Sequence, residues 1–220
     1  MKRQLMKTND GSMTIHLPEI NEQYHSKHGA LQEAQHVFIK MGLEYKRKDS
    51  NFLNVLEIGF GTGLNCLLTL ENNTDLNIHY TAVEAYPVSK EEWQAMDYGS
   101  LLDSQESNYN YKLLHESQWG KSTAILSNFI LDKQQKTFQE INDEQSIDLI
   151  YFDAFGPRVQ PELWTEEIFI IMYKALKKGG VLTTYCAKGS VRRAMQDVGF
   201  TVERLEGPPG KREMLRATKC

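Results

Sequence analysis

Three acidic residues stand where a carboxylate could bind or orient a ligand, because each lies in or directly after an apolar, strand-like run. Glu57 lies two positions before a stretch of alternating glycines, Glu84 follows a second apolar run, and Asp153 follows a third. A carboxylate at the end of a parallel strand can accept hydrogen bonds from both hydroxyls of a ribose, or hold the N–H groups of an amine. The three positions together predict a site for a nucleoside-containing ligand.

The glycine stretch, Glu57-x-Gly59-x-Gly61-x-Gly63, narrows the class of that ligand. A dinucleotide fingerprint would have its third glycine where Leu64 stands, and no Gly-Lys-Ser/Thr follows as in a phosphate-binding P-loop. The spacing resembles the first motif of the Rossmann-like S-adenosylmethionine (AdoMet) methyltransferases. The expected cofactor contacts are Glu57, Gly59, Phe60, Gly61, Thr62, Gly63, Asn65 and Glu84. Tight packing at the glycines and a solvated acid at position 84 are the alternative interpretation.

In many AdoMet enzymes an acidic residue after the third strand contacts the adenine amino group. The corresponding stretch here, 132–137, has no clear acid at the expected place. Gln135 or Thr137 could substitute for it, so the adenine contacts stay open.

Asp153 is the candidate catalytic residue, because Ala154-Phe155-Gly156-Pro157 follows it as in methyltransferases that act on amino groups. An alkyl amine with a pKa of about 10 is mostly protonated at neutral pH. Methyl transfer from a sulfonium is an in-line displacement and needs the amine lone pair aimed at the methyl carbon. Asp153 could hold the N–H groups and aim that lone pair, with Phe155 and Pro157 as pocket walls. In the alternative interpretation, Asp153 only ends a strand.

The elements that must position these residues alternate between strand and helix. Strands are expected over 53–58, 78–83, 147–153, 181–186, 200–206 and 213–219, with short strands at 123–126 and 129–133. Helices are expected over 30–45, 64–70, 161–178 and 190–198, and within 97–119. Another helix should begin at a capping box formed by Ser89 and Glu92. Gly179-Gly180 should stop one helix, and Ser190 should cap the next. The alternation predicts an α/β, Rossmann-like fold with a mostly parallel seven-stranded sheet whose last strand is antiparallel. Its ligand lies above the carboxyl ends of the strands.

The N-terminal segment is expected to add an appendage to that core. Residues 3–8 and 13–17 alternate as in a hairpin around the turn Asn9-Asp10-Gly11-Ser12, and a polar loop follows at 24–29. A single domain over 1–220 is expected, with hairpin, loop and helix in 1–45 and the Rossmann-like core in 46–220.

Composition limits the partners. The formal net charge of −4 gives no overall attraction for nucleic acid, so RNA binding would need a local patch. Candidates for such a phosphate-contacting patch are Lys188, Arg192, Arg193, Lys211 and Arg212, although surface cations are equally often only solvated. Three cysteines without a CxxC, no metal-ligand spacing among the histidines and no membrane-length apolar run predict a metal-free cytoplasmic protein.

Several further motifs resemble, in order and spacing from about Tyr24 to Thr218, the methyltransferase module of the MnmC family of tRNA wobble-uridine modification enzymes. They are Tyr24-His25-Ser26, Gly29-Ala30, Glu33, His36-Val37-Phe38, Glu57 to Asn65, Asp153 to Pro157, Pro161-Glu162-Leu163-Trp164-Thr165, Val191-Arg192-Arg193 and Gly210-Lys211-Arg212-Glu213-Met214. The resemblance implies AdoMet-dependent methylation of 5-aminomethyl-2-thiouridine in tRNA to 5-methylaminomethyl-2-thiouridine. It also implies pocket roles for Tyr24, Glu33 and Asp153.

The fused members of that family carry an FAD-dependent oxidase module after the methyltransferase, whereas this sequence ends at Cys220. The resemblance therefore implies a stand-alone methyltransferase without FAD, for which a separate oxidase would be a partner. Two other functions stay open. An aminopropyltransferase of the spermidine-synthase kind shares the glycine turn, the ribose acid and the aspartate after the fourth strand, and a non-catalytic AdoMet- or RNA-binding protein is the other alternative.

Overall fold

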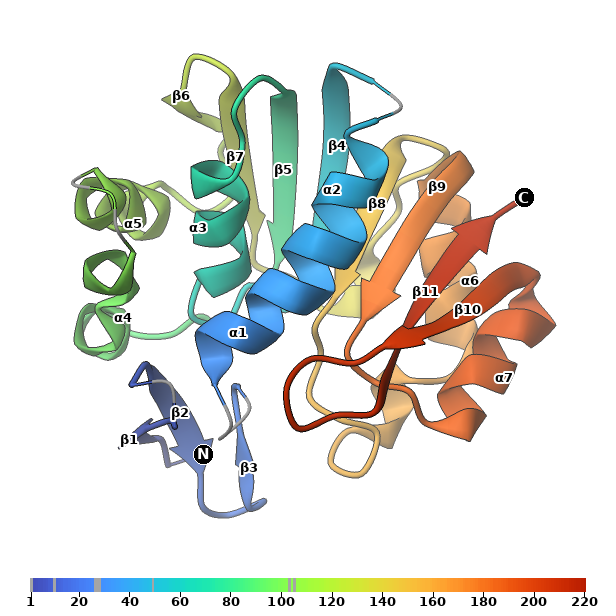
Figure 1. Ribbon diagram of the computed structural model, residues 1–220, viewed down its shortest axis with the longest axis horizontal. Coiled ribbons are helices and arrows are strands. Elements are labelled where there is room, and N and C mark those ends of the chain that lie inside the picture. The colour runs from blue at the N-terminus through green and yellow to red at the C-terminus, as the bar shows by residue number, and fades with distance from the viewer. Residues whose placement is uncertain (1, 10, 26–28, 49, 103, 105) are drawn as a thin grey trace.

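The computed structural model describes residues 2–9, 11–25, 29–48, 50–102, 104 and 106–220, and arranges their strands in two sheets (Figure 1). The small sheet is antiparallel, in the order β1 (Gln4–Lys7), β2 (Met13–Leu17), β3 (Glu22–Gln23). The large sheet has the order β10 (Phe200–Glu206), β11 (Glu213–Lys219), β9 (Leu176–Thr184), β8 (Ile147–Phe152), β4 (Phe52–Ile58), β5 (Asn77–Val83), β7 (Phe129–Gln134), β6 (Thr123–Leu126).

The predicted α/β fold is confirmed. The five strands from β7 to β9 are parallel, and β11 lies antiparallel between β9 and β10. The large sheet has eight strands instead of seven, because β6 turns back at Ser127-Asn128 and pairs with β7 along the edge. The predicted N-terminal hairpin is present as β1 and β2, and β3 adds a third strand to it. Asp10 of its predicted turn, and residues 26–28 of the predicted polar loop, lie outside the described residues.

Helices cover both faces of the large sheet (Figure 1). On one face lie α1 (Ala30–Ala34), the π-helical η1 (Gln35–Leu43), α2 (Glu44–Lys46), α3 (Leu64–Glu71), α4 (Lys90–Met96), η2 (Tyr98–Leu101) and α5 (Ser107–Glu116). On the other lie η3 (Phe138–Glu140), η4 (Pro161–Leu163), α6 (Glu166–Ala175) and α7 (Gly189–Val198). Two apolar cores result, one on each side of the sheet, and the parallel strands are apolar on both faces because both are covered. Within the described ranges, no helix is long and apolar enough to cross a membrane.

Two predicted helix boundaries are wrong. The helix expected over 161–178 is a short 3-10 turn followed by α6, and it ends at Ala175 because Leu176 already pairs with Ile147 in the sheet. Gly179, with φ of 74°, therefore lies in an irregular stretch of β9 and does not stop a helix. The predicted cap of α7, Ser190, lies inside that helix, because the N-cap is Lys188. The capping box of α4 at Ser89 and the stop of α7 at Gly199 are confirmed.

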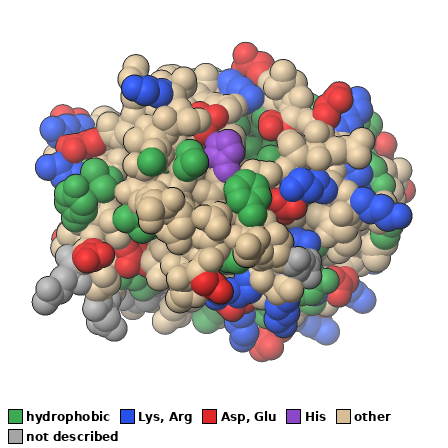
Figure 2. Space-filling view, turned by 90° about the horizontal axis from the view of Figure 1, so that it is seen from above, with side chains coloured by type: hydrophobic (Ala, Val, Ile, Leu, Met, Phe, Trp, Pro, Cys, Tyr) green, Lys and Arg blue, Asp and Glu red, His purple; other side chains and the backbone are tan. Residues whose placement is uncertain are grey.

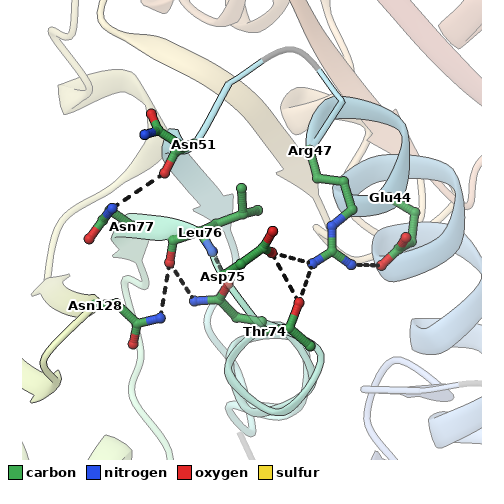
Figure 3. A network of polar contacts seen from close by, with 9 residues as sticks. Glu44, Arg47, Asn51, Thr74, Asp75, Leu76, Asn77 and Asn128 are labelled. Atoms are coloured by element: carbon green, nitrogen blue, oxygen red, sulfur yellow. Dashed lines mark hydrogen bonds and ion pairs between the residues drawn. The ribbon is translucent and has the colours of Figure 1, made fainter.

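A polar network closes the amino end of the parallel strands (Figure 3). Arg47, after α2, donates to Thr74 Oγ1 and to Asp75 Oδ1, each at 2.9 Å. Asn128, in the turn between β6 and β7, donates to the carbonyl of Leu76 at 3.1 Å. Figure 2, which views the molecule from above this end, shows acidic and basic side chains interspersed. These bonds fix where the strands begin, and so also where their carboxyl ends lie.

Candidate active site

A cavity of about 750 Å³ lies at the carboxyl ends of the parallel strands. Its walls come from the loops that follow all five of them, and from β3 of the small sheet with the residues just after it. The lining stretches are 59–62 with 64–65, 84–86, 137–139, 153–158 with 160 and 162–163, 185–186 with 188, and 22–25. Since residues from both sheets meet here, the cavity is the natural place for a ligand in this fold.

The glycine turn at the start of α3 depends on its three glycines. Gly59, Gly61 and Gly63 all have positive φ, of 90°, 50° and 74°. A Cβ on Gly59 would lie 3.0 Å from the carbonyl oxygen of Asp153, and one on Gly63 only 2.8 Å from Nε2 of His115. Any side chain here would displace the neighbouring loop or the buried histidine, so the turn can keep its backbone against the cavity only with glycine.

Glu84 is fixed at the end of β5 by two backbone N–H groups. One carboxylate oxygen accepts from Gly61 N at 3.0 Å, and the other accepts from Tyr86 N at 2.9 Å. Each oxygen keeps a lone pair for a further donor, which fits the pair of hydroxyls on a ribose. Gln135 and Thr137 were the two candidates for contacting adenine. Thr137 lines the cavity, whereas Gln135 does not.

Asp153 lies on the cavity wall directly after β8, and its Oδ2 accepts a hydrogen bond from Asn65 Nδ2 at 2.8 Å. Burial raises the pKa of Asp153 to about 7, against the opposing hydrogen bond from Asn65. The negative charge of Glu33 raises this pKa further and the positive charge of Lys211 lowers it. Near neutral pH the carboxyl group can therefore both accept and release a proton, which suits a group that handles an amine.

Glu57 is fully buried below the glycine turn and does not line the cavity. Neither of its carboxylate oxygens has a hydrogen-bond partner among the described residues. Burial raises the pKa of Glu57 well above its usual value, and the negative charge of Asp153 raises it further. The polar side chains of Asn65 and Tyr80 nearby lower this pKa, but by less than burial raises it. These surroundings favour the neutral form of Glu57, so the structure does not place a carboxylate there in direct reach of a ligand.

An aromatic pair forms one wall near Asp153. The ring of Tyr24 packs edge-on against Phe155, with 5.0 Å between ring centroids. Burial raises the pKa of Tyr24 to about 12, so its hydroxyl stays protonated. Pro157 lines the same side of the cavity.

Beside the cavity, two side-chain contacts join α1 to the hairpin of β10 and β11 and to Tyr185. Glu33 of α1 forms an ion pair with Lys211, and Lys211 Nζ lies 4.0 Å from the ring centroid of Tyr185. The Tyr185 hydroxyl donates to the carbonyl of Ala154 at 2.9 Å, beside Asp153. Tyr185 was not predicted from the sequence, although it directly follows β9 just as Glu84 and Asp153 follow their strands.

The structure brings together most of the residues proposed from the sequence. Those that line the cavity are Tyr24, Gly59, Phe60, Gly61, Thr62, Asn65, Glu84, Asp153, Phe155, Pro157 and Lys188; those that do not are Glu33, Glu57, Gly63, Arg192, Arg193, Lys211 and Arg212. Lys211 and Arg212 line a second, smaller cavity, and Lys188 belongs to both. Arg192 and Arg193 line neither. Among the described residues, no three His, Cys, Asp or Glu side chains gather as metal ligands.

Residues 105–220 match the family described as S-adenosyl-L-methionine-dependent methyltransferase. The chain is similar to the tRNA 5-methylaminomethyl-2-thiouridine biosynthesis bifunctional protein MnmC of Delftia acidovorans, at 30% identity over 217 residues, with 93% of this chain and 33% of that protein covered. The MnmC of Marinomonas sp. is 28% identical, with 90% and 31% covered. The chain thus spans about a third of the length of these curated relatives.

Two solved structures share the fold. MNMC2 from Aquifex aeolicus superposes with a TM-score of 0.80 at 22% identity, covering 99% of this chain and 70% of that one. Spermidine synthase from Thermotoga maritima superposes with a TM-score of 0.62 at 15% identity, covering 98% and 68%. At these identities the likeness concerns the fold alone.

Proposed function

Because the chain belongs to the family of S-adenosyl-L-methionine-dependent methyltransferases, we propose that it methylates the aminomethyl nitrogen of 5-aminomethyl-2-thiouridine at the wobble position of tRNA. The product would be 5-methylaminomethyl-2-thiouridine, the nucleoside in the names of its MnmC relatives. The main support from the site is Asp153, a carboxyl group with a pKa of about 7 on the wall of the ligand cavity.

The residues around the cavity fit AdoMet. Glu84 would accept the ribose hydroxyls, and the turn from Gly59 to Gly63 would face the rest of the cofactor without intervening side chains. Thr137 lies where the adenine ring is expected. Bound AdoMet supplies a methyl group on a positively charged sulfur. Glu57 would lie below the turn as a neutral group and would not be a direct ligand.

Asp153 would act on the acceptor. Its ionised carboxylate binds the substrate ammonium group, takes one proton from it and holds the remaining N–H groups, so that the nitrogen lone pair is free for displacement. Tyr24, Phe155 and Pro157 would exclude water from the amine. Glu33 would set the proton affinity of Asp153, since its charge raises the pKa of that group.

The tRNA would be held outside the cavity by Lys188, Arg192, Arg193, Lys211 and Arg212. The MnmC relatives are named as bifunctional and are about three times as long as this chain. We assign the preceding removal of a carboxymethyl group to an FAD-dependent oxidase outside these 220 residues. With this reaction, the protein would act in the cytoplasm.

Methyl-labelled AdoMet and tRNA from a strain that lacks this modification test the proposal. We expect label in the tRNA and, after digestion, in 5-methylaminomethyl-2-thiouridine. Absence of label in tRNA under conditions where AdoMet binds would instead indicate a non-catalytic binding protein. Calorimetry with AdoMet and decarboxylated AdoMet separates the aminopropyltransferase alternative, which requires preference for the decarboxylated form.

A further inference from the structure

A second cavity, of about 500 Å³, adjoins the first and is strongly basic. Lys188, Arg204, Lys211 and Arg212 line it, with Glu213 as its one acidic lining residue. It shares Tyr185 and Lys188 with the first cavity, so the two are neighbours across the Tyr185 side chain. Four cations around one hollow, in a chain of net charge −4, indicate a site for an anion.

The four cations differ in how far they are already neutralised. Lys211 is paired with Glu33 and lies over the Tyr185 ring, so it forms part of the wall between the cavities. Arg204 lies 3.8 Å from Glu213 and is largely exposed, which makes that ion pair weak. Lys188 and Arg212 form no ion pair with any described residue. These two side chains therefore remain able to bind an incoming anion.

Helix α7 begins at this rim, because its N-cap residue lines the second cavity. Its N-cap is Lys188, and no side chain caps the N–H groups of the turn. Such free N–H groups at a helix start favour a negatively charged oxygen nearby. Together with the lysine and arginine, they make a phosphate the ligand that fits best.

The position of the second cavity relative to Asp153 indicates which phosphate of an RNA substrate would bind there. In a pyrimidine nucleotide in its usual anti conformation, the edge that carries C5 and C6 faces the 5′-phosphate of the same nucleotide. A C5 aminomethyl group that reaches Asp153 therefore brings its own 5′-phosphate close by. Tyr185 bridges this gap in the protein, because its hydroxyl bonds to Ala154 beside Asp153 while its ring lines the second cavity.

We propose that the second cavity binds the 5′-phosphate of the nucleotide being methylated, through Lys188 and Arg212, with Arg204 at its outer side. The inference rests on the proposed function, and it names the contact that places the target base. It separates these residues from Arg192 and Arg193, which line neither cavity and would contact only more distant phosphates of a larger RNA.

A stem-loop RNA that contains 5-aminomethyl-2-thiouridine, made with either a phosphodiester or one uncharged methylphosphonate 5′ to that nucleoside, tests the contact. With the wild-type chain, we expect the methylphosphonate to lower kcat/KM about 10-fold, as for loss of a charge-assisted contact. Lys188→Ala/Arg212→Ala should be impaired with the phosphodiester RNA and lose little more with the methylphosphonate. Arg193→Ala removes a charge from the same helix, but should retain the full difference between the two RNAs.

Each other outcome is informative. If the wild-type chain methylates both RNAs equally, the phosphate site is wrong while the proposed function stands. If the double variant still shows the full 10-fold difference, the phosphate is bound elsewhere. If the wild-type chain methylates neither RNA, the proposed function itself fails. Calorimetry with AdoMet and thermal unfolding of each variant show whether its fold and cofactor site are intact.

Discussion

Strand β8 has an aspartate at each end, and the two carboxyl groups differ in their hydrogen bonds and ion pairs. Near its start, Asp148 accepts from the backbone N–H of Asn54 at 2.8 Å and from Lys177 Nζ at 2.9 Å. Directly after its end, Asp153 accepts one side-chain hydrogen bond, from Asn65, and forms no ion pair with a described residue. One carboxylate is satisfied as an anion, whereas the other is kept close to the point at which it gains or loses a proton.

The two ends of the whole sheet also differ in the polar contacts that their residues make. At the amino end, Arg47 and Asn128 join three chain segments by ordinary hydrogen bonds (Figure 3). At the carboxyl end, both oxygens of Glu57 and Oδ1 of Asn65 are buried without a hydrogen-bond partner among the described residues. Nε2 of His79 and Oγ of Ser146, toward the amino end, also lack a partner among the described residues, so such groups occur at both ends of the sheet. Unsatisfied buried groups lower stability, and those of Glu57 and Asn65 lie next to the cavity.

The largest expected effect separates the two aspartates of β8. Asp153→Ala should lower turnover at least ~100-fold with AdoMet binding nearly intact, because it removes the group proposed to accept the amine proton. Asp148→Ala should instead lower the free energy of unfolding by roughly 1–3 kcal/mol, since the partly buried N–H of Asn54 and the Lys177 side chain lose their acceptor. Steady-state methylation and denaturant unfolding of both variants measure this. Unchanged turnover in Asp153→Ala would rule out its assigned role.

The next effect concerns the pH dependence of stability. Because the pKa of Glu57 is raised in the folded state, the folded chain retains a proton that the unfolded chain releases. The free energy of unfolding should therefore fall as pH rises above the ordinary glutamate pKa, with a slope of up to about 1.4 kcal/mol per pH unit for one proton. Asp153 contributes in the same direction until about pH 7.

Glu57→Gln should remove its part of that slope, as measured by denaturant unfolding at a series of pH values. Glu44→Gln at the amino end is the matched control, because its carboxylate pairs with Arg47 and reaches solvent. An identical slope in wild type and Glu57→Gln would mean that Glu57 is ionised in the folded chain.

The smallest effect is a shift of the pH–activity profile in two directions. Glu33 raises the pKa of Asp153 and Lys211 lowers it. The inflection of kcat/KM should therefore move to lower pH in Glu33→Gln and to higher pH in Lys211→Met, by about one pH unit or less. Arg47→Met, at the other end of the sheet, should leave the inflection in place. Shifts of the same sign in the first two variants would show that the ion pair acts only through packing.

The sequence was sufficient to predict the place of a residue that directly follows a parallel strand. Glu84 and Asp153 follow apolar runs, and a parallel sheet gathers the carboxyl ends of its strands at one edge, so both lie at the cavity as expected. The positive φ of the glycines also follows from their residue type and spacing. Tyr185 could have been found by the same rule.

Other features depend on contacts between segments that are distant in the sequence, so the residues around them do not predict them. The ion pair between Glu33 and Lys211 joins the first helix to the last hairpin. The early end of α6 depends on the pairing of Leu176 with Ile147, which overrides the glycine stop signal. Glu57 was expected at the ligand, and only the packing of α3 against the sheet shows that it is buried below the turn.

The position of β11 between β9 and β10 also orders events during protein synthesis. The glycine turn and Glu84 come from the first half of the chain, whereas Arg212 and the partner of Glu33 emerge from the ribosome with the final hairpin. A nascent chain can therefore form the part of the site that we propose binds AdoMet well before the part that we propose binds the acceptor. The acceptor side is completed only when the last strand inserts, so a chain interrupted before that point would lack its second cavity.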